Sequence, residues 1–326
     1  MRITVFEVRE DERDFLCRMA QQENVTLCMT EQPLGEETLS FAEGSDGVSI
    51  LGHSHLDKAL LKKLKERGIG AVSTRTIGFN HMDVQAAHRL GVRVAHASYP
   101  PNGVADFTVM LMLLTLRNYK PAMWRQNVND YSLDGLRGRE LRSLTVGVLG
   151  TGSIGRMVMK NLSGFGCRML AYDPHPHEEA AALAQYVPME TLLRESDLIT
   201  LHMPLTPETD HLINSETLKK MKDGVVLINT ARGALADIHA LTKGIETGKI
   251  GALGMDVLEN EEGIYHNDRR TDIIKNRDMV YLRQFPNVVL TQHMAFYTQE
   301  SVESMAHCGV ITLCQMLRGE ECPLEL

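Results

Sequence analysis

Residues 144–173 read LTVGVLGTGSIGRMVMKNLSGFGCRMLAYD, and this stretch decides the fold class. The apolar run 144–149 predicts a buried parallel strand, and 167–172 predicts the next strand, which leads to Asp173. Three glycines at G-x-G-x-x-G spacing lie between them: Gly150, Gly152 and Gly155. In a dinucleotide-binding turn the first permits a tight bend, the second lets the backbone approach a pyrophosphate, and the third lets helix and strand pack closely. A helical stretch and an acid about 20 residues on complete the fingerprint.

The acid at the end of the second strand bears on which dinucleotide binds. A carboxylate such as that of Asp173 accepts hydrogen bonds from the ribose hydroxyls of NAD and repels the 2′-phosphate of NADP. The residues that follow, 174–179, contain no Arg or Lys. The sequence therefore predicts NAD(H), with its phosphates at the N-terminus of the helix after the glycine turn.

The bulk properties narrow the class of protein. A chain of 326 residues is long enough for two domains. Its net charge of −8, without a basic stripe, argues against nucleic acid as a partner. No apolar stretch approaches the ~20 residues of a membrane span, and the N-terminus does not read as a signal peptide. Six cysteines without a C-x-x-C pair predict free thiols in a reducing cytoplasm, and no histidine pair has zinc-site spacing, so no metal is expected.

Apolar strands alternate with amphipathic helices in two blocks, which predicts parallel sheets covered by helices. In the first block we expect strands at 3–8, 47–51, 71–75 and 92–96, and a helix at 56–68. The second block begins with the glycine fingerprint and continues with strands at 198–202, 224–230, 252–257 and 287–291. The predicted fold is α/β, with a Rossmann-type doubly wound sheet for the cofactor and a flavodoxin-like α/β domain for the substrate.

About 100 residues precede the cofactor block, so the chain is expected to divide into two domains. A breaker cluster at 100–103 is followed by a long helical stretch at 105–116. The C-terminal helical stretch, 300–317, could return to the first block. We therefore assign 1–101 with 299–326 to the substrate domain and 102–298 to the NAD-binding domain. A small ligand is expected in the cleft between domains.

Several stretches between residues 73 and 298 resemble one enzyme family, in the family's order. Examples are STRTIGFNHMD (73–83), YPPNGVAD (99–106), MKDGVVLINTARGALAD (221–237), GMDVLENEEG (254–263) and QHMAFYT (292–298). The chain resembles the NAD-dependent D-2-hydroxyacid dehydrogenases, most closely the D-lactate dehydrogenases of the kind associated with vancomycin resistance. The resemblance implies that a small 2-keto acid, pyruvate above others, is reduced to the D-2-hydroxy acid with NADH, in a cytoplasmic homodimer.

Three residues follow predicted strands and carry groups that this chemistry needs. Arg232 offers a planar fork to a carboxylate, although alone it would read as a surface ion-pair partner. His293 can donate a proton to a carbonyl oxygen near neutral pH. Glu261 could hydrogen-bond His293, keep its ring oriented and favour its charged form. The resemblance makes these the catalytic set and selects Glu261 over its acidic neighbours, Glu259 and Glu262.

The resemblance also implies the residues around the ligands. Those implied for the substrate are Ile77, Gly78, Tyr99, Arg232 and Phe296. Those implied for the cofactor are Gly150, Gly152, Ser153, Ile154, Gly155, Asp173, Met203, Pro204, Thr209, Thr230, Ala231 and Asp256. Within this set, Asp256 is expected to hydrogen-bond the nicotinamide carboxamide. Only Gly152, Ile154, Gly155 and Asp173 also stand on spacing alone.

Two other functions fit the same residues. One is a D-2-hydroxyacid dehydrogenase for a bulkier keto acid. A cleft narrowed by aromatic side chains would instead favour the methyl group of pyruvate. The other is an NADH-sensing, corepressor-like binding protein without turnover, which retention of the three catalytic residues does not exclude.

Overall fold

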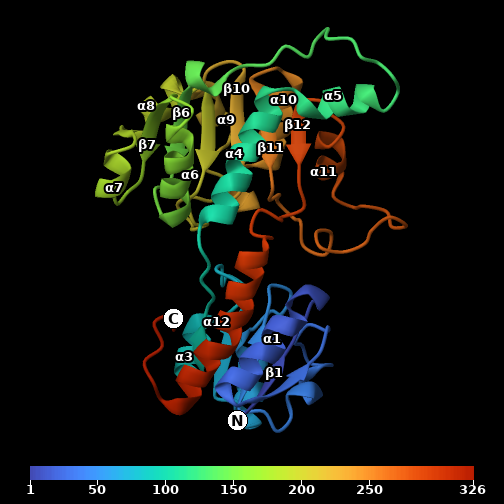
Figure 1. Cartoon of the computed structure of the whole chain (residues 1–326), viewed down its shortest axis with the longest axis vertical. Helices are drawn as coiled ribbons and strands as arrows, with labels where there is room; N and C mark the ends of the chain where they lie inside the picture. The colour runs from blue at the N-terminus through green and yellow to red at the C-terminus, as the bar shows by residue number, and fades with distance from the viewer. The chain divides into compact units, whose positions relative to one another are not determined.

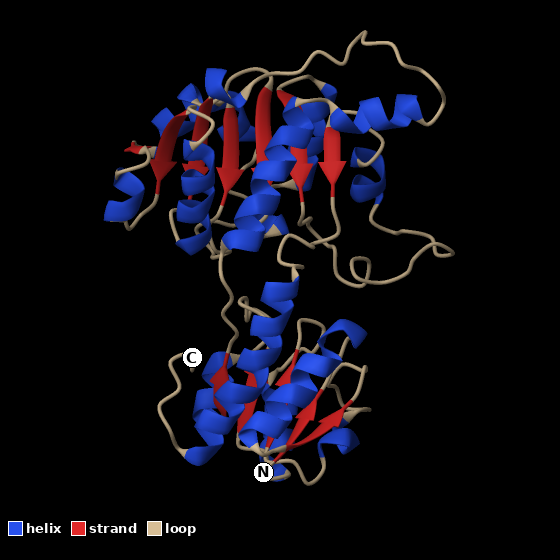
Figure 2. Cartoon of the chain, in the orientation of Figure 1, coloured by secondary structure: helices blue, strands red, loops and turns tan.

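Short runs of aliphatic residues, each followed by a helix, form two separate parallel sheets (Figures 1 and 2). The computed structural model describes residues 1–326. The chain forms two units, the first from Met1–Pro100 with Tyr297–Leu326 and the second from Pro101–Phe296. Both chain ends therefore belong to the first unit. The predicted α/β class, with two helix-covered parallel sheets, is confirmed.

The first unit holds five parallel strands in the order β2-β1-β3-β4-β5, which is the flavodoxin-like order. The strands are β1 (Arg2–Val5), β2 (Thr26–Met29), β3 (Gly47–Ile50), β4 (Ala71–Thr74) and β5 (Arg93–Ala95). The helices are α1 (Glu10–Glu23), α2 (Lys58–Glu66), α3 (Val84–Leu90), α12 (Gln299–Arg318) and the 3-10 turn η1 (Leu39–Ala42). β3 and β4 are buried along their whole length, as strands covered on both faces must be.

The C-terminal helix α12 packs on α1 and on the sheet of the first unit (Figure 1). Ser73 donates its hydroxyl to the carbonyl of Gly309 over 2.8 Å. A Cβ at Gly309 would lie 2.5 Å from Cγ of Arg75, so the helix approaches this arginine very closely. Arg75 and Glu12 form a fully buried ion pair at 3.0 Å. The buried face of α12 is thus part of the core of the first unit.

The second unit holds seven parallel strands in the order β12-β11-β10-β9-β6-β7-β8. They are β6 (Thr145–Leu149), β7 (Arg168–Tyr172), β8 (Gln185–Tyr186), β9 (Leu198–Leu201), β10 (Val225–Asn229), β11 (Ile250–Met255) and β12 (Val288–Leu290). Chain order runs outward from β6 in one direction and then from β9 in the other, so this is the predicted doubly wound sheet. Ligands of such sheets bind at the carboxyl ends of the strands where the order reverses, here between β6 and β9.

Helices cover both faces of this second sheet. They are α4 (Asn102–Leu116), α5 (Tyr119–Gln126), α6 (Ser153–Ser163), α7 (Glu178–Ala181), α8 (Met189–Glu195), α9 (Ser215–Lys220), α10 (Ile238–Glu246) and α11 (Arg277–Leu282), with the 3-10 turns η2 (Leu141–Ser143) and η3 (Gly233–Leu235). α4 lies across β10 and β11 beside α6 (Figure 1). Gly254 permits that approach, because a Cβ there would meet side chains of α4 and β10. No helix is both long and apolar enough to cross a membrane.

Candidate active site

The glycine turn after β6 has the geometry that the fingerprint predicts. Gly150 has a φ of +93°, and a Cβ on it would lie 2.5 Å from the carbonyl oxygen of His202. A Cβ on Gly155 would lie 2.1 Å from the carbonyl oxygen of Gly150. Gly152 differs, because a Cβ there would meet no atom within 4 Å. Backbone contacts therefore require the outer two glycines, whereas the middle one borders open space.

That open space lies at the N-terminus of α6. No side chain caps this helix, so the N–H groups of its first turn are not satisfied by a protein side chain. Ser153 and Ile154, its first two residues, are exposed and half-buried respectively. Uncapped N–H groups and the positive end of the helix dipole suit a pyrophosphate. The turn thus fits the phosphates of a dinucleotide.

Asp173 lies just after β7, beside this turn. Its Oδ2 accepts hydrogen bonds from the backbone N–H and the hydroxyl of Thr151, at 2.6 and 3.1 Å, and its Oδ1 accepts from the N–H of His175 at 2.8 Å. Burial alone would raise the pKa of Asp173, but these hydrogen bonds outweigh it and lower the pKa below its usual value. An ionised carboxylate at this strand end fits the ribose hydroxyls of NAD.

The other residues expected at the cofactor follow β9, β10 or β11. Met203 is buried and Pro204 exposed. The hydroxyl of Thr209 donates to the carbonyl of Pro204 over 2.7 Å and closes that loop. Thr230 shares a hydrogen bond of 2.8 Å with Thr108 of α4. These loops begin at the same edge of the sheet as the glycine turn, because all the strands are parallel.

The proposed catalytic residues follow three adjacent strands. Arg232 comes after β10, Glu261 after β11 and His293 after β12. Nδ1 of His293 lies 2.5 Å from Oε1 of Glu261, and Oε2 of Glu261 accepts the backbone N–H of Leu258 at 2.6 Å. One carboxylate therefore ties the imidazole to the end of β11, with the other ring nitrogen, Nε2, left for another partner.

The turn that carries Arg232 is fixed to the same segment. The side-chain amide of Asn229 donates to the carbonyl of Arg232 over 2.8 Å, and its oxygen accepts the N–H of Ala231 at 3.0 Å. A Cβ on Gly233 would lie 2.3 Å from the carbonyl carbon of Leu258. The Arg232 turn thus packs directly on the residue that Glu261 binds. No motif in the sequence marks Asn229 for this part.

The three neighbouring acids of this loop have different partners. Glu261 pairs with His293, whereas Oε1 of Glu259 lies 2.9 Å from Nε2 of His211. Glu262 is exposed. The hydrogen bond that His211 donates to Glu259 raises the pKa of His211 above its usual value. Of the three acids, Glu261 alone is paired with the proposed proton donor.

Asp256 makes hydrogen bonds that the sequence did not predict. It is fully buried, and its carboxylate accepts the hydroxyl of Thr291 at 2.6 Å and the N–H groups of Met294 and Ala295 at 2.9 and 2.7 Å. Its backbone oxygen also accepts the N–H of His293 at 2.7 Å. Asp256 therefore holds the loop that carries His293. Its contact with the nicotinamide stays a prediction.

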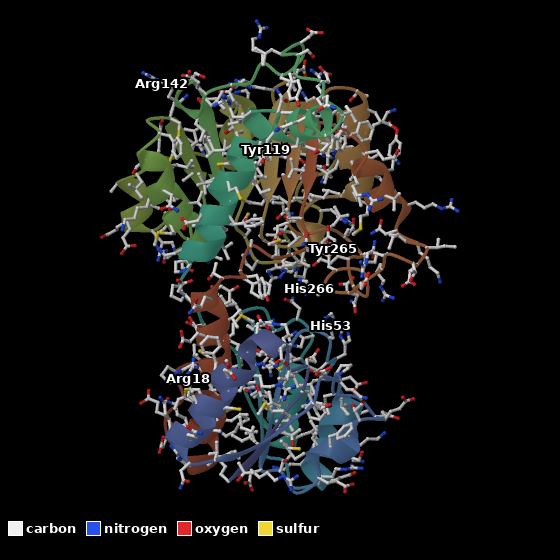
Figure 3. All side chains as sticks on the ribbon, turned by 45° about the vertical axis from the view of Figure 1, so that its right-hand side comes forward. Arg18, His53, Tyr119, Arg142, Tyr265 and His266 are labelled. Atoms are coloured by element: carbon white, nitrogen blue, oxygen red, sulfur yellow. The ribbon has the colours of Figure 1, made fainter.

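Aromatic rings surround His293. The ring of Phe296 meets the imidazole edge to face, with centroids 6.4 Å apart, and the ring of His266 lies 6.0 Å from it. Nε2 of His266 also lies 2.9 Å from the carbonyl oxygen of His293. Tyr265 and His266 sit on the loop between β11 and α11 (Figure 3). Burial and the charges of nearby Glu261 and Asp256 raise the pKa of Tyr265, so its phenol is neutral. Phe296 was predicted from the sequence as a substrate residue, and that role stays a prediction, whereas His266 was not predicted to lie beside His293.

The remaining substrate residues belong to the first unit. Ile77 and Gly78 lie in the turn after β4, and Tyr99 lies after β5. The hydroxyl of Thr76 donates to the carbonyl of Gly78 over 2.7 Å and shapes this turn. All three predicted residues are half-buried. Their contact with a substrate stays a prediction.

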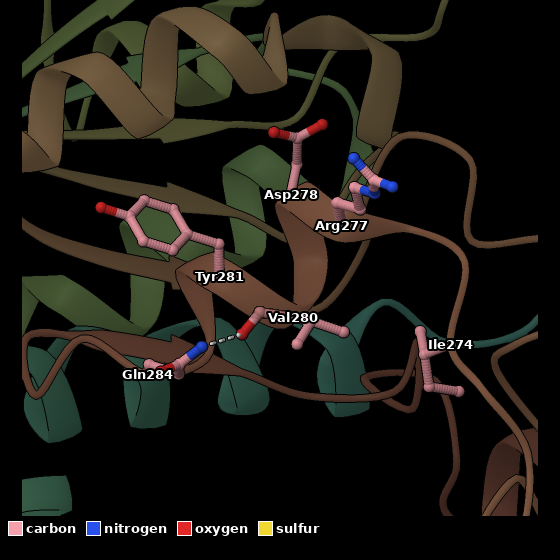
Figure 4. A pocket seen from close by; sticks show the side chains of 6 residues that line it. All are labelled: Ile274, Arg277, Asp278, Val280, Tyr281 and Gln284. Carbon is pink, nitrogen blue, oxygen red and sulfur yellow. Dashed lines mark hydrogen bonds between the residues drawn. The ribbon is translucent and has the colours of Figure 1, made fainter.

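Two hollows lie near the C-terminal end of the second unit. One, of about 560 Å³, is lined by the loop 264–270 together with Thr291 and Gln292, beside His293. The other, of about 440 Å³, lies over α11 and is drawn in Figure 4. Its lining residues are Ile274, Arg277, Asp278, Val280, Tyr281 and Gln284. None of these six is a predicted site residue, and we assign this second hollow no role.

The sequence and the structure of this chain are similar to those of known proteins. Residues 109–295 match the family model described as the NAD binding domain of D-isomer specific 2-hydroxyacid dehydrogenase. The chain is 41% identical over 315 residues to the aromatic 2-oxoacid reductase of Clostridium sporogenes, a match that covers 96% of this chain and 95% of the relative. It is 36% identical over 328 residues to the D-lactate dehydrogenase of Escherichia coli, covering 100% of both. A crystal structure of a D-lactate dehydrogenase from Treponema pallidum matches with a TM-score of 0.90 at 31% identity, covering 100% of this chain and 99% of that one.

Proposed function

Since this chain belongs to the D-isomer specific 2-hydroxyacid dehydrogenases, a family of NAD-dependent oxidoreductases, we propose that it reduces pyruvate to D-lactate. The observation that carries the proposal is the pairing of His293 with Glu261, on the same sheet edge as Arg232 and the glycine turn. A proton donor, a carboxylate-binding cation and a dinucleotide turn at one edge are what 2-keto acid reduction requires.

NADH, when bound, supplies the hydride for this reduction. Arg232 binds the substrate carboxylate through its guanidinium fork. His293 donates a proton from Nε2 to the carbonyl oxygen as negative charge develops there. Glu261 is hydrogen-bonded to Nδ1 and so orients the ring with Nε2 pointing away from the Glu261 carboxylate. The same carboxylate stabilises the charged imidazolium before the proton is transferred to the substrate. Asp256 keeps the His293 loop in place.

The size of the substrate side chain separates pyruvate from its rivals. The ring of Phe296 stands edge-on to the imidazole and occupies space beside it, which favours a methyl group. A second candidate is an aromatic 2-oxoacid, because a relative 41% identical is named an aromatic 2-oxoacid reductase. Both candidates use the same catalytic residues, so only the relative rates distinguish them.

The test is kcat/KM for pyruvate, phenylpyruvate, 2-ketoisocaproate and hydroxypyruvate, each measured with NADH and NADPH. We expect the highest value for pyruvate with NADH. A tenfold or greater preference for phenylpyruvate would assign the aromatic activity instead, and no turnover with any 2-oxoacid would contradict both. As a control, His293→Ala should lose about 10²–10⁴-fold in kcat while still binding NADH.

We also propose that the enzyme is a homodimer in the cytoplasm. An apolar face of the second unit, formed by α4, α5 and the segment 128–133, exposes large side chains (Tyr119 is labelled in Figure 3). Its most exposed members are Tyr119, Trp124, Val128, Tyr131 and Leu133, at 46–82% of full exposure. Several large apolar side chains exposed within one stretch of chain favour a protein interface, and we propose a second copy of the chain as its partner. All six cysteines are free, which fits a reducing compartment.

A further inference from the structure

We infer that Tyr186 and the hydroxyl of Thr151 are positioning residues for the Asp173 carboxylate, and that discrimination between NAD and NADP depends on all three side chains. The inference rests on the assignment of Asp173 to the adenosine ribose. It concerns the orientation of that carboxylate, which the sequence motif does not specify.

The three side chains form a continuous chain of hydrogen bonds. The phenol of Tyr186 donates to Oγ1 of Thr151 over 2.7 Å, and the Thr151 hydroxyl donates to Oδ2 of Asp173 over 3.1 Å. The backbone N–H of His177 donates to the phenol oxygen of Tyr186 over 3.0 Å. Because the Thr151 oxygen accepts from Tyr186, its single proton is directed toward the carboxylate. Removing the phenol oxygen therefore leaves the Thr151 hydroxyl free to turn.

These hydrogen bonds favour one orientation of the Asp173 carboxylate. A carboxylate has about four acceptor sites. Thr151 fills two on Oδ2, with its N–H and its hydroxyl, and His175 fills one on Oδ1. One site on Oδ1 remains for a ribose hydroxyl. A 2′-phosphate in the same place would meet an anion whose rotation away from it is opposed by these three hydrogen bonds.

The hydrogen bonds from Tyr186 to Thr151 and from Thr151 to Asp173 also give a role to the edge strand of the second sheet. Thr151 follows β6, Asp173 follows β7 and Tyr186 lies in β8, the two-residue edge strand. These strands are adjacent and parallel, with Ala171 of β7 beside Tyr186. Thr151 is fully buried and Tyr186 is half-buried, so water competes little for the hydrogen bond between them. Tyr186 of β8 thereby connects the glycine turn, through Thr151, to Asp173.

The test measures the dissociation constants of NADH and NADPH by calorimetry on the full chain, without turnover. Tyr186→Phe and Thr151→Val each remove one hydroxyl with little change of shape. We expect NADH affinity to fall about three- to tenfold while NADPH affinity stays within about twofold, so that the preference for NADH decreases. Thr151→Ser, which keeps the hydroxyl, should restore most of the preference. Tyr281→Phe, which removes a phenol of α11 that donates to Glu246 of α10, is the matched control and should change neither constant.

A double-mutant cycle separates positioning from a merely structural role. In an Asp173→Ala background, Tyr186→Phe should cause no further loss of NADH affinity. An unchanged preference in Tyr186→Phe, or a loss that persists undiminished in the Asp173→Ala background, overturns the inference while leaving Asp173 in its role. An unchanged preference in Asp173→Ala itself overturns both. Turnover of pyruvate by the native enzyme tests the proposed reaction separately.

Discussion

At the scale of single residues, the loop after β11 directs neighbouring acids to different partners. Asn260, between Glu259 and Glu261, has a φ of 57°, in the left-handed region where the chain turns sharply. Its flanking side chains therefore diverge, one to His211 and the other to His293. Because the two acids are chemically alike and two positions apart, they form a matched pair for testing which one serves catalysis.

We predict that Glu261→Gln lowers kcat for pyruvate about a hundredfold or more, because an amide cannot stabilise the charged imidazole. Glu259→Gln removes the same charge from the same loop and should leave kcat within about threefold of native. Steady-state kinetics on both variants checks this. Equal losses in the two would show that the loop's total charge, and not the His293 contact, matters.

His211 should titrate above the usual range for histidine, because its hydrogen bond to Glu259 favours the charged ring. The pair therefore contributes stability that is present below the unfolded-state pKa of about 6.5 and is lost as pH rises through the higher folded-state pKa. An NMR titration of the histidine ring protons measures this pKa. In Glu259→Gln it should return toward the ordinary value, and an unchanged pKa would contradict the assignment.

Sequence reasoning reached the residues that a motif or a register marks. Gly152, Gly155 and Asp173 follow from spacing, and the choice of Glu261 follows from its register in the family motif. It could not reach Asn229, Tyr186 or the loop-holding part of Asp256. The partners of Asp256 lie more than thirty positions away, and no local pattern records such a contact. Long-range hydrogen bonds of this kind exist only once the strand ends meet.

At the scale of elements, the sequence predicted the strands whose side chains are fully buried. β3, β4, β9 and β10 contain mostly apolar or small residues with no charged one, and they are buried throughout. Two strands, β2 and β8, and several helices, α1 among them, were not predicted. β2 is a half-exposed edge strand, β8 has only two residues, and α1 is rich in charged residues with few apolar ones. Periodicity is weak where one face of an element meets solvent.

The junction of β6 and α6 gives a prediction at this scale. A Cβ at Gly155 would collide with the backbone oxygen of Gly150, 2.1 Å away, so the helix must shift from the strand. We expect Gly155→Ala to destabilise the protein by about 1–3 kcal/mol and to weaken NADH binding at least tenfold. Thermal unfolding and calorimetry measure the two effects.

Gly164→Ala, at the other end of the same helix, is the control. Its nearest contact for a new Cβ is 3.9 Å away, and its φ is −67°, which suits alanine. It should leave NADH affinity unchanged and alter stability little. A comparable loss of NADH affinity in both variants would place the effect in the helix as a whole.

At the scale of the whole molecule, the apolar face over α4, α5 and 128–133 predicts association. Val128 and Leu133 are 74% and 82% exposed. Introducing charge there, as Val128→Asp with Leu133→Glu, should convert a dimer into monomers of 36.4 kDa, because a buried unpaired charge is costly. Sedimentation equilibrium measures the mass. Ile273→Glu, at a position 91% exposed outside this face, should not change it, and a native protein that is already monomeric would contradict the prediction.

The first unit is built from two separate segments of the chain, and this affects how it folds during synthesis on the ribosome. Residues 1–100 include Arg75 and Glu12, yet the helix that packs on them, α12, is synthesised only after the whole of Pro101–Phe296. Synthesis of the intervening Pro101–Phe296, at ~5–20 residues per second, takes about 10–40 s. Throughout that interval the nascent N-terminal sheet lacks α12, and the apolar surface that α12 covers is exposed to chaperones and proteases. A polypeptide arrested before residue 297 would be digested within its first hundred residues, whereas the finished chain would resist.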